Sequence, residues 1–591
     1  MCRPARIAFR WFACVCWLLP ALAVAEDADP LLRALTDELE RSRQLRIAGL
    51  DAPYFIEYRV EDTNSYSISA TLGALISLRE SHVRIPMVSV RVGDYAFDNS
   101  NHIYSEAPSG SRYAPDELPL EDNYSAFRQV LWLATDHAYK TAEDAIARKR
   151  SSLKNMSVPD QLPDFSKASP IHAILPVKKE PRNPGVWKDR VVKLSAIFAD
   201  YPQVLSSGIE MHVSESTNYV VNSEGTAERT PEDVAYIRVR ANGLASDGTT
   251  VRDAEVMQAF DENGLPAETE LRRQVSEVAK DVTALAQAPA GEAYDGPMLF
   301  EARAAAQLFG QVLGDNLKVA RKPVTDPGRA APHVASELEN RVGSRILPEW
   351  MDVVDDSTQT EWRGHTLLGH YSYDIEGVAP EPLPLIEKGL LRTYLLTRTP
   401  AFKGFESSNG HARLTSLFGA RGAGFGNLFV RASQSMPASD MKKQLIEMCV
   451  QRNKPYGILV RKLDYPSSAS LDELRRMAAG MAQSGGSGHP VTAPLLIYKV
   501  YPDGKEELVR AVRFRGLSTR SLKDIVAASD ESYVFDLIDS NAPLALMGAG
   551  SYLTTASVIA PAVLFDELEL EPIQEDVPKP PLVPPPSLTG F

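Results

Sequence analysis

Long stretches in which apolar and polar residues alternate constrain the fold of this chain most. One runs over residues 54–98 and a second over residues 208–260. Alternation with a period of two gives a β-strand one apolar face. Apolar residues at helical spacing lie within residues 29–47 and 125–155, and helices of this kind can cover such a face. The pattern predicts an N-terminal domain in which helices pack on a sheet.

The chain after residue 290 has a different pattern. Residues 296–317 ("GPMLFEARAAAQLFGQVLGDNL") predict a strand end followed by a helix, and the region after residue 360 is strand-rich with one clear helix at 435–453. The predicted fold class is α+β, with a β-rich C-terminal domain. The predicted divisions are a signal peptide at 1–25, an N-terminal α+β domain at 26–190, a central β-meander and helix at 191–290, the C-terminal domain at 291–572 and a Pro-rich tail at 573–591.

The first 25 residues have the pattern of a secretory signal peptide. Arg3, Arg6 and Arg10 precede an apolar run that ends in the small-residue sequence "AVA" at Ala25, where cleavage is expected. The run is shorter than the roughly 20 residues of a transmembrane helix, and no stop-transfer pattern follows it. A retained anchor is therefore the less favoured alternative. We expect an exported protein, periplasmic or secreted, with no membrane span after cleavage.

The cysteine content and the net charge restrict which cross-links, metal sites and binding partners this chain can have. Only Cys449 remains after cleavage, so the mature chain has no intramolecular disulfide and no multi-cysteine zinc site. The formal charge of −14 becomes −17 once the three arginines of the signal peptide are removed. Such an acidic balance argues against nucleic acid as a partner and favours a soluble protein or a peptide substrate.

Seven segments in a fixed order carry a resemblance to a known family. They are "YVVNSEGT", "LASDG", "LFEARAAAQLFGQVL", "YSYDIEGVAPEPLPLIEKGLLRTYLLTRTPA", "SSNGHARL", "GNLFV" and "VIAPAVLFDELEL". Their order and spacing resemble the TldD/PmbA family of metallopeptidases, also called modulators of DNA gyrase. The resemblance implies a β-rich C-terminal domain of TldD/PmbA type that encloses a peptide-binding cavity. It also implies subunits that work in pairs, one holding zinc through an HExxxH helix and a cysteine near the C-terminus.

The zinc ligands that the resemblance implies are missing from this sequence. Phe300 and Ala305 occupy the two histidine positions, and only Glu301 matches the motif. No histidine occurs between His212 and His333, so the absence does not depend on the alignment register. Zinc catalysis needs about three protein ligands and an open position for water. Glu301 has a structural alternative, because a carboxylate at a helix start interacts favourably with the helix dipole.

The remaining possible ligands are scattered. The loop at 540–558 that should supply the cysteine has none, and Cys449 on the helix at 435–453 is interpreted as a core residue. His365 and His370 lie five residues apart in a strand-like region, on opposite faces. A rebuilt site could bring His411 and His489 together with Glu301 or Asp374, although loop histidines are usually just hydrogen-bonded. The Asp374–Glu376 pair is interpreted as a solvated turn. We therefore predict no metal and no cofactor in this chain.

The segment "SSNGHARL" is the candidate substrate-binding surface. In the family it lies on the cavity side, so the resemblance implies that Asn409, Gly410, His411 and Arg413 contact a peptide. The structural alternative is an ordinary surface loop in which Arg413 is satisfied by the protein itself.

Three functions follow from these observations. The favoured one is the non-catalytic, PmbA-like subunit of a metallopeptidase, which shapes a peptide cavity for a TldD-like partner that carries HExxxH and zinc. A second is a stand-alone periplasmic peptide-binding protein. A third is an active metallopeptidase with non-standard ligands such as His365, His370 or His411.

Overall fold

The computed structural model describes residues 29–103, 111–113, 118–154, 162–177, 182–326, 328, 333, 335–415, 421–465, 491–539 and 554–573. The predicted signal peptide, His489 and the loop at 540–553 lie outside these residues, as does the tail from residue 574. The fold is α+β, as predicted. Within the described part of the chain, no helix combines the length and apolar character needed to cross a bilayer.

A strongly curved seven-stranded sheet forms the N-terminal half. Its order is β4-β2-β1-β6-β7-β5, with β8 also paired to β7. The divisions 26–190 and 191–290 both contribute strands to this one sheet, because β1 pairs with β6 over most of its length. The strands are β1 (Pro53–Thr71), β2 (Ala74–Val92), β4 (Ser111–Tyr113), β5 (His172–Ile174), β6 (Val204–Asn222), β7 (Ala227–Leu244) and β8 (Thr250–Ala259).

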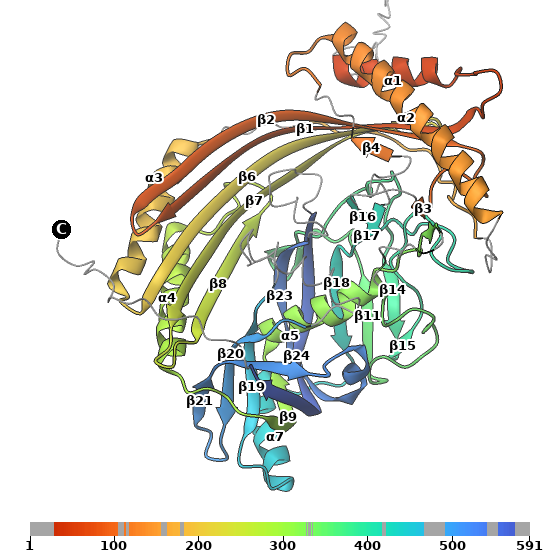
Figure 1. The fold of residues 1–591 in the computed structure, drawn as a ribbon. Helices are drawn as coiled ribbons and strands as arrows, with labels where there is room; N and C mark the ends of the chain where they lie inside the picture. Colours follow the sequence, from red (N-terminus) through yellow and green to blue (C-terminus); the bar gives the residue numbers. More distant parts are fainter. Residues whose placement is uncertain are drawn as a thin grey trace, which may run out of the picture.

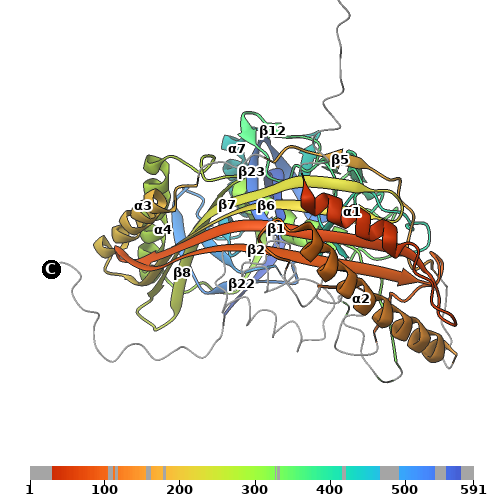
Figure 2. The same cartoon turned by 90° about the horizontal axis from the view of Figure 1, so that it is seen from above.

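Helices cover the convex face of this sheet at both ends (Figures 1 and 2). Ile56, Tyr58 and Val60 of β1 pack in one core cluster with α1 and α2, and Tyr66 and Ile68 pack in a second one with α3 and α4. This confirms the prediction of helices on a sheet. The helices are α1 (Pro30–Ser42), α2 (Tyr124–Leu153), α3 (Pro184–Ser195), the 3-10 helix η1 (Ala196–Asp200) and α4 (Glu268–Gln287).

The concave face of the same sheet carries charged residues and is also buried. Glu57, Arg59, Glu61 and Thr63 alternate with the apolar residues of β1, and each is 2–3% exposed. Burial of charged groups is costly unless they are paired. The face is buried because the C-terminal domain lies beneath it (Figure 1).

The C-terminal domain is an eleven-stranded mixed sheet wrapped around one helix. Its order is β15-β14-β11-β18-β24-β9-β19-β20-β21, and β22 and β23 also pair with β24. The strands are β9 (Tyr294–Phe300), β11 (Met351–Asp355), β14 (Leu383–Glu387), β15 (Leu390–Leu391), β18 (Asn427–Ala432), β19 (Gly457–Leu463), β20 (Pro494–Val500), β21 (Glu506–Val509), β22 (Val512–Arg515), β23 (Ile525–Asp539) and β24 (Thr554–Pro572).

The central helix is α5 (Ala302–Phe309), which continues into the π-helical turn η2 (Gly310–Gly314) and α6 (Asp315–Leu317). All residues from Ala304 to Gly314 are buried. The outer helix α7 (Ala438–Gln451) holds Cys449 in an apolar cluster, as predicted. Short elements complete the domain: β10 (Val324–Thr325), paired with β3 (His102–Ile103), β12 (Glu361–Trp362), β13 (His365–Thr366), β16 (Ala412–Thr415), β17 (Arg421–Ala423) and the 3-10 helix η4 (Thr519–Asp524).

Candidate functional site

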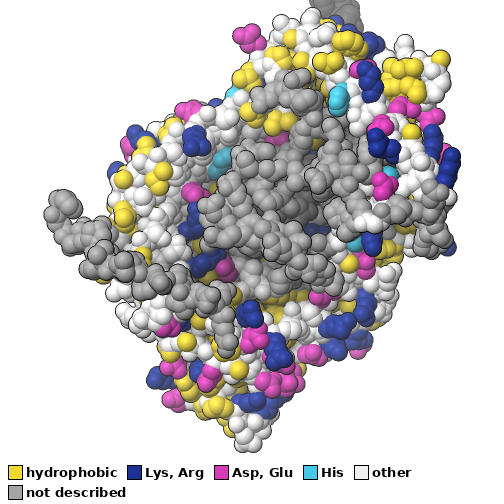
Figure 3. Space-filling view, in the orientation of Figure 1, with side chains coloured by type: hydrophobic (Ala, Val, Ile, Leu, Met, Phe, Trp, Pro, Cys, Tyr) yellow, Lys and Arg dark blue, Asp and Glu magenta, His cyan; other side chains and the backbone are white. Residues whose placement is uncertain are grey.

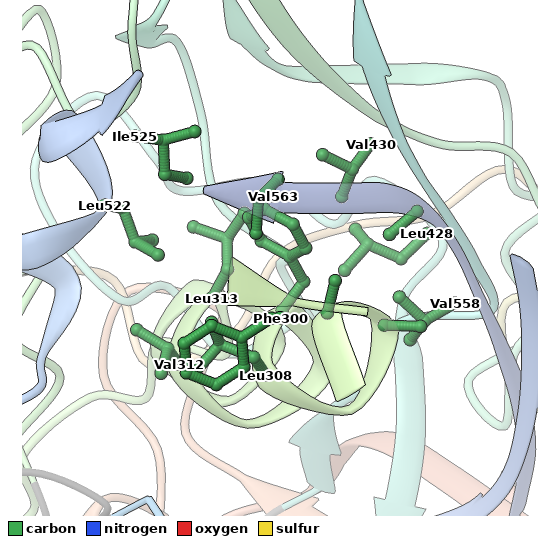
Figure 4. Close-up of a cluster of buried hydrophobic side chains, with 14 of the residues drawn as sticks. Phe300, Leu308, Val312, Leu313, Leu428, Val430, Leu522, Ile525, Val558 and Val563 are labelled. Atoms are coloured by element: carbon green, nitrogen blue, oxygen red, sulfur yellow. The ribbon is translucent and has the colours of Figure 1, made fainter. Parts of the chain in front are cut away.

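The two positions that the family motif assigns to histidines lie in the apolar core. Phe300 is the last residue of β9 and Ala305 is on α5, and both are fully buried. The ring of Phe300 packs against Phe565 and Phe514 at centroid distances of 5.5 and 5.6 Å. Figure 4 shows Phe300 among Leu308, Val558 and other aliphatic side chains. The residues at this place offer no lone pair to a metal, so they do not fit zinc.

Glu301 sits at the junction between β9 and α5, away from this core. It occupies the N-cap position of α5, but its carboxylate makes no side-chain cap hydrogen bond. Instead it accepts a hydrogen bond of 3.0 Å from Nε of Arg461, whose Nη2 donates to Glu506 at 2.8 Å. The Glu301 side chain is 44% exposed. It therefore belongs to a surface ion-pair network.

The histidines considered as alternative ligands each have a hydrogen-bond partner of their own within the protein. Nε2 of His365 lies 2.7 Å from Asp536, and Nδ1 of His370 lies 2.8 Å from the Ser357 carbonyl oxygen. His411 is fully buried, with Nδ1 2.8 Å from the backbone oxygen of Asn409. Among the residues that the structure describes, no three His, Cys, Asp or Glu side chains are grouped so as to hold a metal ion.

A cavity of about 250 Å³ lies between the concave face of the N-terminal sheet and the loops of the C-terminal domain. This volume is slightly below the roughly 300–1,000 Å³ of pockets that hold drug-sized ligands. The cavity is lined from the sheet side by Arg59, Leu175, Asn218, Val220, Glu228, Thr230, Pro231, Glu232, Asp233 and Phe260, and from the C-terminal side by His370, Tyr371, Ser372, Tyr373, Asp374, Ile375, Arg413 and Thr555.

Strand register places Arg59 and Glu228 on the same wall of this cavity. Arg59 of β1 is opposite Val220 of β6, and Val220 is opposite Glu228 of β7. Residues in one cross-strand row share a face of the sheet. Among the described residues, Nε and Nη1 of Arg59 and Oε2 of Glu228 are buried without a hydrogen-bond partner. The wall thus presents both unpaired donors and an unpaired acceptor.

Arg413 reaches the cavity from the opposite domain. Its guanidinium lies over the ring of Tyr371, 4.0 Å from the centroid, and Nη2 donates to the Thr555 carbonyl oxygen at 3.2 Å. A planar guanidinium is well suited to stacking of this kind. These contacts fix the side chain, yet its Nε has no hydrogen-bond partner in the described part of the chain.

The other three predicted substrate-binding residues are part of the scaffold. The Asn409 side chain accepts a hydrogen bond from the Leu396 amide and donates to the Tyr394 carbonyl oxygen. Gly410 adopts φ +80°, and a Cβ there would lie 2.7 Å from the Ala379 oxygen. His411 is buried, and none of the three lines the cavity. The structure thus brings only Arg413 of the four to the candidate site.

Three carboxyl groups that line the cavity have raised pKa values. Burial raises the pKa of Glu228 to about 7, and the nearby charges of Asp374 and Glu232 add to this rise. The hydrogen bond from Thr230 and the charge of Arg59 act in the opposite direction. Burial and the neighbouring acids raise the pKa of Asp233 to about 7. Asp374 is raised to a pKa of about 7 by burial and by the charge of Glu376.

The turn that contains Asp374 and Glu376 is buried. The two residues are 2% and 3% exposed, which corrects the interpretation of a solvated turn. Oδ1 of Asp374 accepts the amides of Glu376 and Val378, and Oδ2 accepts the amide of Ala412, each at 2.9 Å. This carboxyl group therefore holds together two loops beneath the sheet.

Arg59 and Glu228 were not among the residues that the sequence singled out. Alternation places Arg59 on the polar face of β1, but it does not show that another domain buries that face. The informative signal is the row of ionisable residues Glu57, Arg59 and Glu61, which is unusually charged for a strand. A charged row is also typical of a strand face in contact with water, so by itself it does not identify the site.

The comparisons with known proteins agree with this architecture. Residues 293–492 match the model of the PmbA/TldA metallopeptidase C-terminal domain. The C-terminal domain belongs to the TldD/PmbA family. Over 242 residues it is 27% identical to a "Metalloprotease" of Methanothermobacter thermautotrophicus, a match that covers 39% of this chain and 47% of the relative. The chain thus spans about half the length of that curated relative.

Solved structures of similar fold cover most of this chain. TldE from Thermococcus kodakarensis superposes with a TM-score of 0.55 at 14% identity, covering 91% of this chain and 100% of TldE. A putative modulator of DNA gyrase from Thermotoga maritima gives a TM-score of 0.54 at 13% identity, covering 87% of this chain and 96% of that protein. The TldD/PmbA-type fold predicted for the C-terminal domain is thereby confirmed.

Proposed function

We propose that this chain is an exported, non-catalytic subunit of a TldD/PmbA-type metallopeptidase, which shapes a peptide-binding cavity for a zinc-bearing partner. One observation carries the proposal: fully buried Phe300 and Ala305 stand where the motif requires histidines, and they are part of the hydrophobic core. A core of this kind cannot open a coordination site without losing its packing.

The cavity between the domains supports the peptide-binding part of the proposal. A peptide backbone presents hydrogen-bond donors and acceptors in alternation. The cavity walls offer both, through Arg59 and Arg413 as donors and Glu228 as an acceptor. Export rests on the N-terminal signal pattern, and the partner is a TldD-like subunit that carries HExxxH.

Reconstitution tests the role of this chain. The mature protein is mixed with a family member from the same genome that carries HExxxH, and cleavage of an unstructured peptide is followed with and without chelator. We expect chelator-sensitive cleavage only when the partner is present, and none after its motif glutamate is replaced by glutamine. Chelator-sensitive cleavage by this chain alone would refute the non-catalytic role.

A second candidate function is peptide binding without any hydrolytic partner. It is favoured by the location of the cavity, whose two walls both come from this one chain. Purification of this chain from a membrane-free extract under native conditions distinguishes the two functions. A subunit co-purifies with the HExxxH protein, whereas a stand-alone binding protein does not.

A further inference from the structure

Two buried arginines from different domains line the interdomain cavity with unpaired nitrogens. Arg59 is 2% exposed and Arg413 is 8% exposed. Nε and Nη1 of Arg59 and Nε of Arg413 have no hydrogen-bond partner among the described residues. Buried polar groups in folded proteins are almost always hydrogen-bonded, so exceptions call for an explanation.

The cost of burial is greater for Arg59 than for its neighbour Glu228. A buried carboxyl group can take up a proton and become neutral, whereas a guanidinium stays charged at any physiological pH. Glu228 therefore relieves its own burial, and Arg59 has no such route. The unpaired guanidinium nitrogens of Arg59 call for an acceptor that stays charged, and a carboxylate matches the geometry of a guanidinium.

The remaining acids of the cavity do not fill this place. Asp374 is occupied by three backbone amides. Asp233 accepts a hydrogen bond of 3.1 Å from the backbone amide of Ser216, and Glu232 accepts one from the side-chain amide of Asn218. His370 is held by the Ser357 carbonyl oxygen. The two arginines thus keep donors for a ligand after the internal bonds have been made.

We propose that the cavity binds a carboxylate of a peptide ligand between Arg59 and Arg413. The carboxylate is either the C-terminus of the peptide or an aspartate or glutamate side chain, since both present the same group. This inference rests on the proposed peptide-binding function and names the chemical group that the site selects.

Binding is measured by isothermal titration of the full mature chain, without any partner, so that the result does not depend on hydrolysis. The probes are an N-acetylated tetra-alanine peptide with a free C-terminus, its C-amidated twin, and an amidated, acetylated peptide with one central glutamate. We expect at least one carboxylate-bearing probe to bind about tenfold or more tightly than the amidated alanine peptide. The stronger of the two identifies the source of the carboxylate.

Variants link the binding to the arginines. Arg59→Gln and, separately, Arg413→Gln should each weaken the carboxylate-bearing probe about tenfold or more and leave the amidated alanine probe unchanged. Arg513→Gln, at an exposed position of β22, is the matched control. If thermal melting shows that Arg59→Gln does not fold, the binding measured for Arg413→Gln tests the proposal alone.

Equal binding of all three probes, no measurable binding of any, or indifference to both substitutions would overturn the proposal. Failure of reconstituted cleavage together with intact, arginine-dependent binding would refute the subunit role and leave the carboxylate site standing.

Discussion

Nη2 of Arg303 on α5 donates to both carboxylate oxygens of Glu255 on β8, at 2.6 and 2.8 Å. The pair joins the central helix of the C-terminal domain to the N-terminal sheet. Lys462 on β19 lies 2.7 Å from Asp253, one more ion pair across the same seam. Burial alone would raise the pKa of Glu255, but Lys462 and Arg303 hold it below its usual value.

Replacing Arg303 with alanine should loosen this seam. We expect a loss of roughly 1–3 kcal/mol in the free energy of unfolding, below the 3–5 kcal/mol of fully buried pairs because the Arg303 side chain is 26% exposed. Urea denaturation followed by tryptophan fluorescence measures it. Arg513→Ala removes an exposed pair and should cost about 1 kcal/mol or less. An equal loss of unfolding free energy in the two variants would show that the Arg303–Glu255 pair stabilises the protein no more than an exposed ion pair does.

Restoring the histidines should damage the protein rather than create a zinc site. Phe300→His places a polar ring in the core, and Ala305→His adds volume where Ala305 is fully buried. Overpacking typically costs about 1–3 kcal/mol, and an unpaired buried polar group adds to that. We expect the double variant to melt well below the parent with or without added zinc. Phe300→Leu is the apolar control, and melting restored by zinc would contradict the prediction.

The stability contribution of Glu228 should depend on pH. Its folded pKa of about 7 lies above the value of about 4.3 expected in the unfolded chain. Between these values the folded protein keeps the proton that the unfolded chain releases. Stability therefore falls as pH rises from about 4 to about 7, and the penalty stays constant above that.

Glu228→Gln removes this penalty and should keep the hydrogen bond from Thr230. Relative to the parent, the variant should gain roughly 2 kcal/mol more at pH 8 than at pH 5. Thermal melts at the two pH values measure the difference. Glu569→Gln on β24 serves as a control at an exposed position. An equal effect of Glu228→Gln at both pH values would show that this carboxyl group is ionised throughout.

Glu301→Gln should be nearly silent. Its ion pair with Arg461 is partly exposed, and such pairs contribute about 0–1 kcal/mol. The same substitution should leave cleavage by the reconstituted complex unchanged, because Phe300 and Ala305 beside Glu301 offer no ligand that could hold a metal-bound water. A loss of activity of a hundredfold or more, with unchanged melting, would assign a catalytic role to Glu301.

The sequence predicted the parts of the fold that depend on local periodicity. The alternation of Ile56, Tyr58 and Val60 predicted the apolar face of β1, and helices do pack there. Cys449 was correctly interpreted as a core residue of its helix. These features follow from neighbouring residues along one element.

The candidate site depends on contacts between elements that are far apart in the chain. Nothing near Arg59 in sequence indicates that Arg413 closes the same cavity from the other domain. Asn409 and His411 are polar loop residues, yet their side chains bond to the Leu396 amide and to Asp355 instead of facing a ligand. Burial decides these roles, and a single sequence does not reveal which loops become buried.

Metal content of the protein expressed as residues 26–591 tests most directly whether this is a metal-free subunit. The protein is purified without a metal-affinity tag, dialysed against a weak chelator and analysed by elemental mass spectrometry. The apolar packing around Phe300 and Ala305 predicts zinc far below one equivalent per chain. Close to one equivalent of zinc, lost on substitution of His365, His370 or His411, would contradict it.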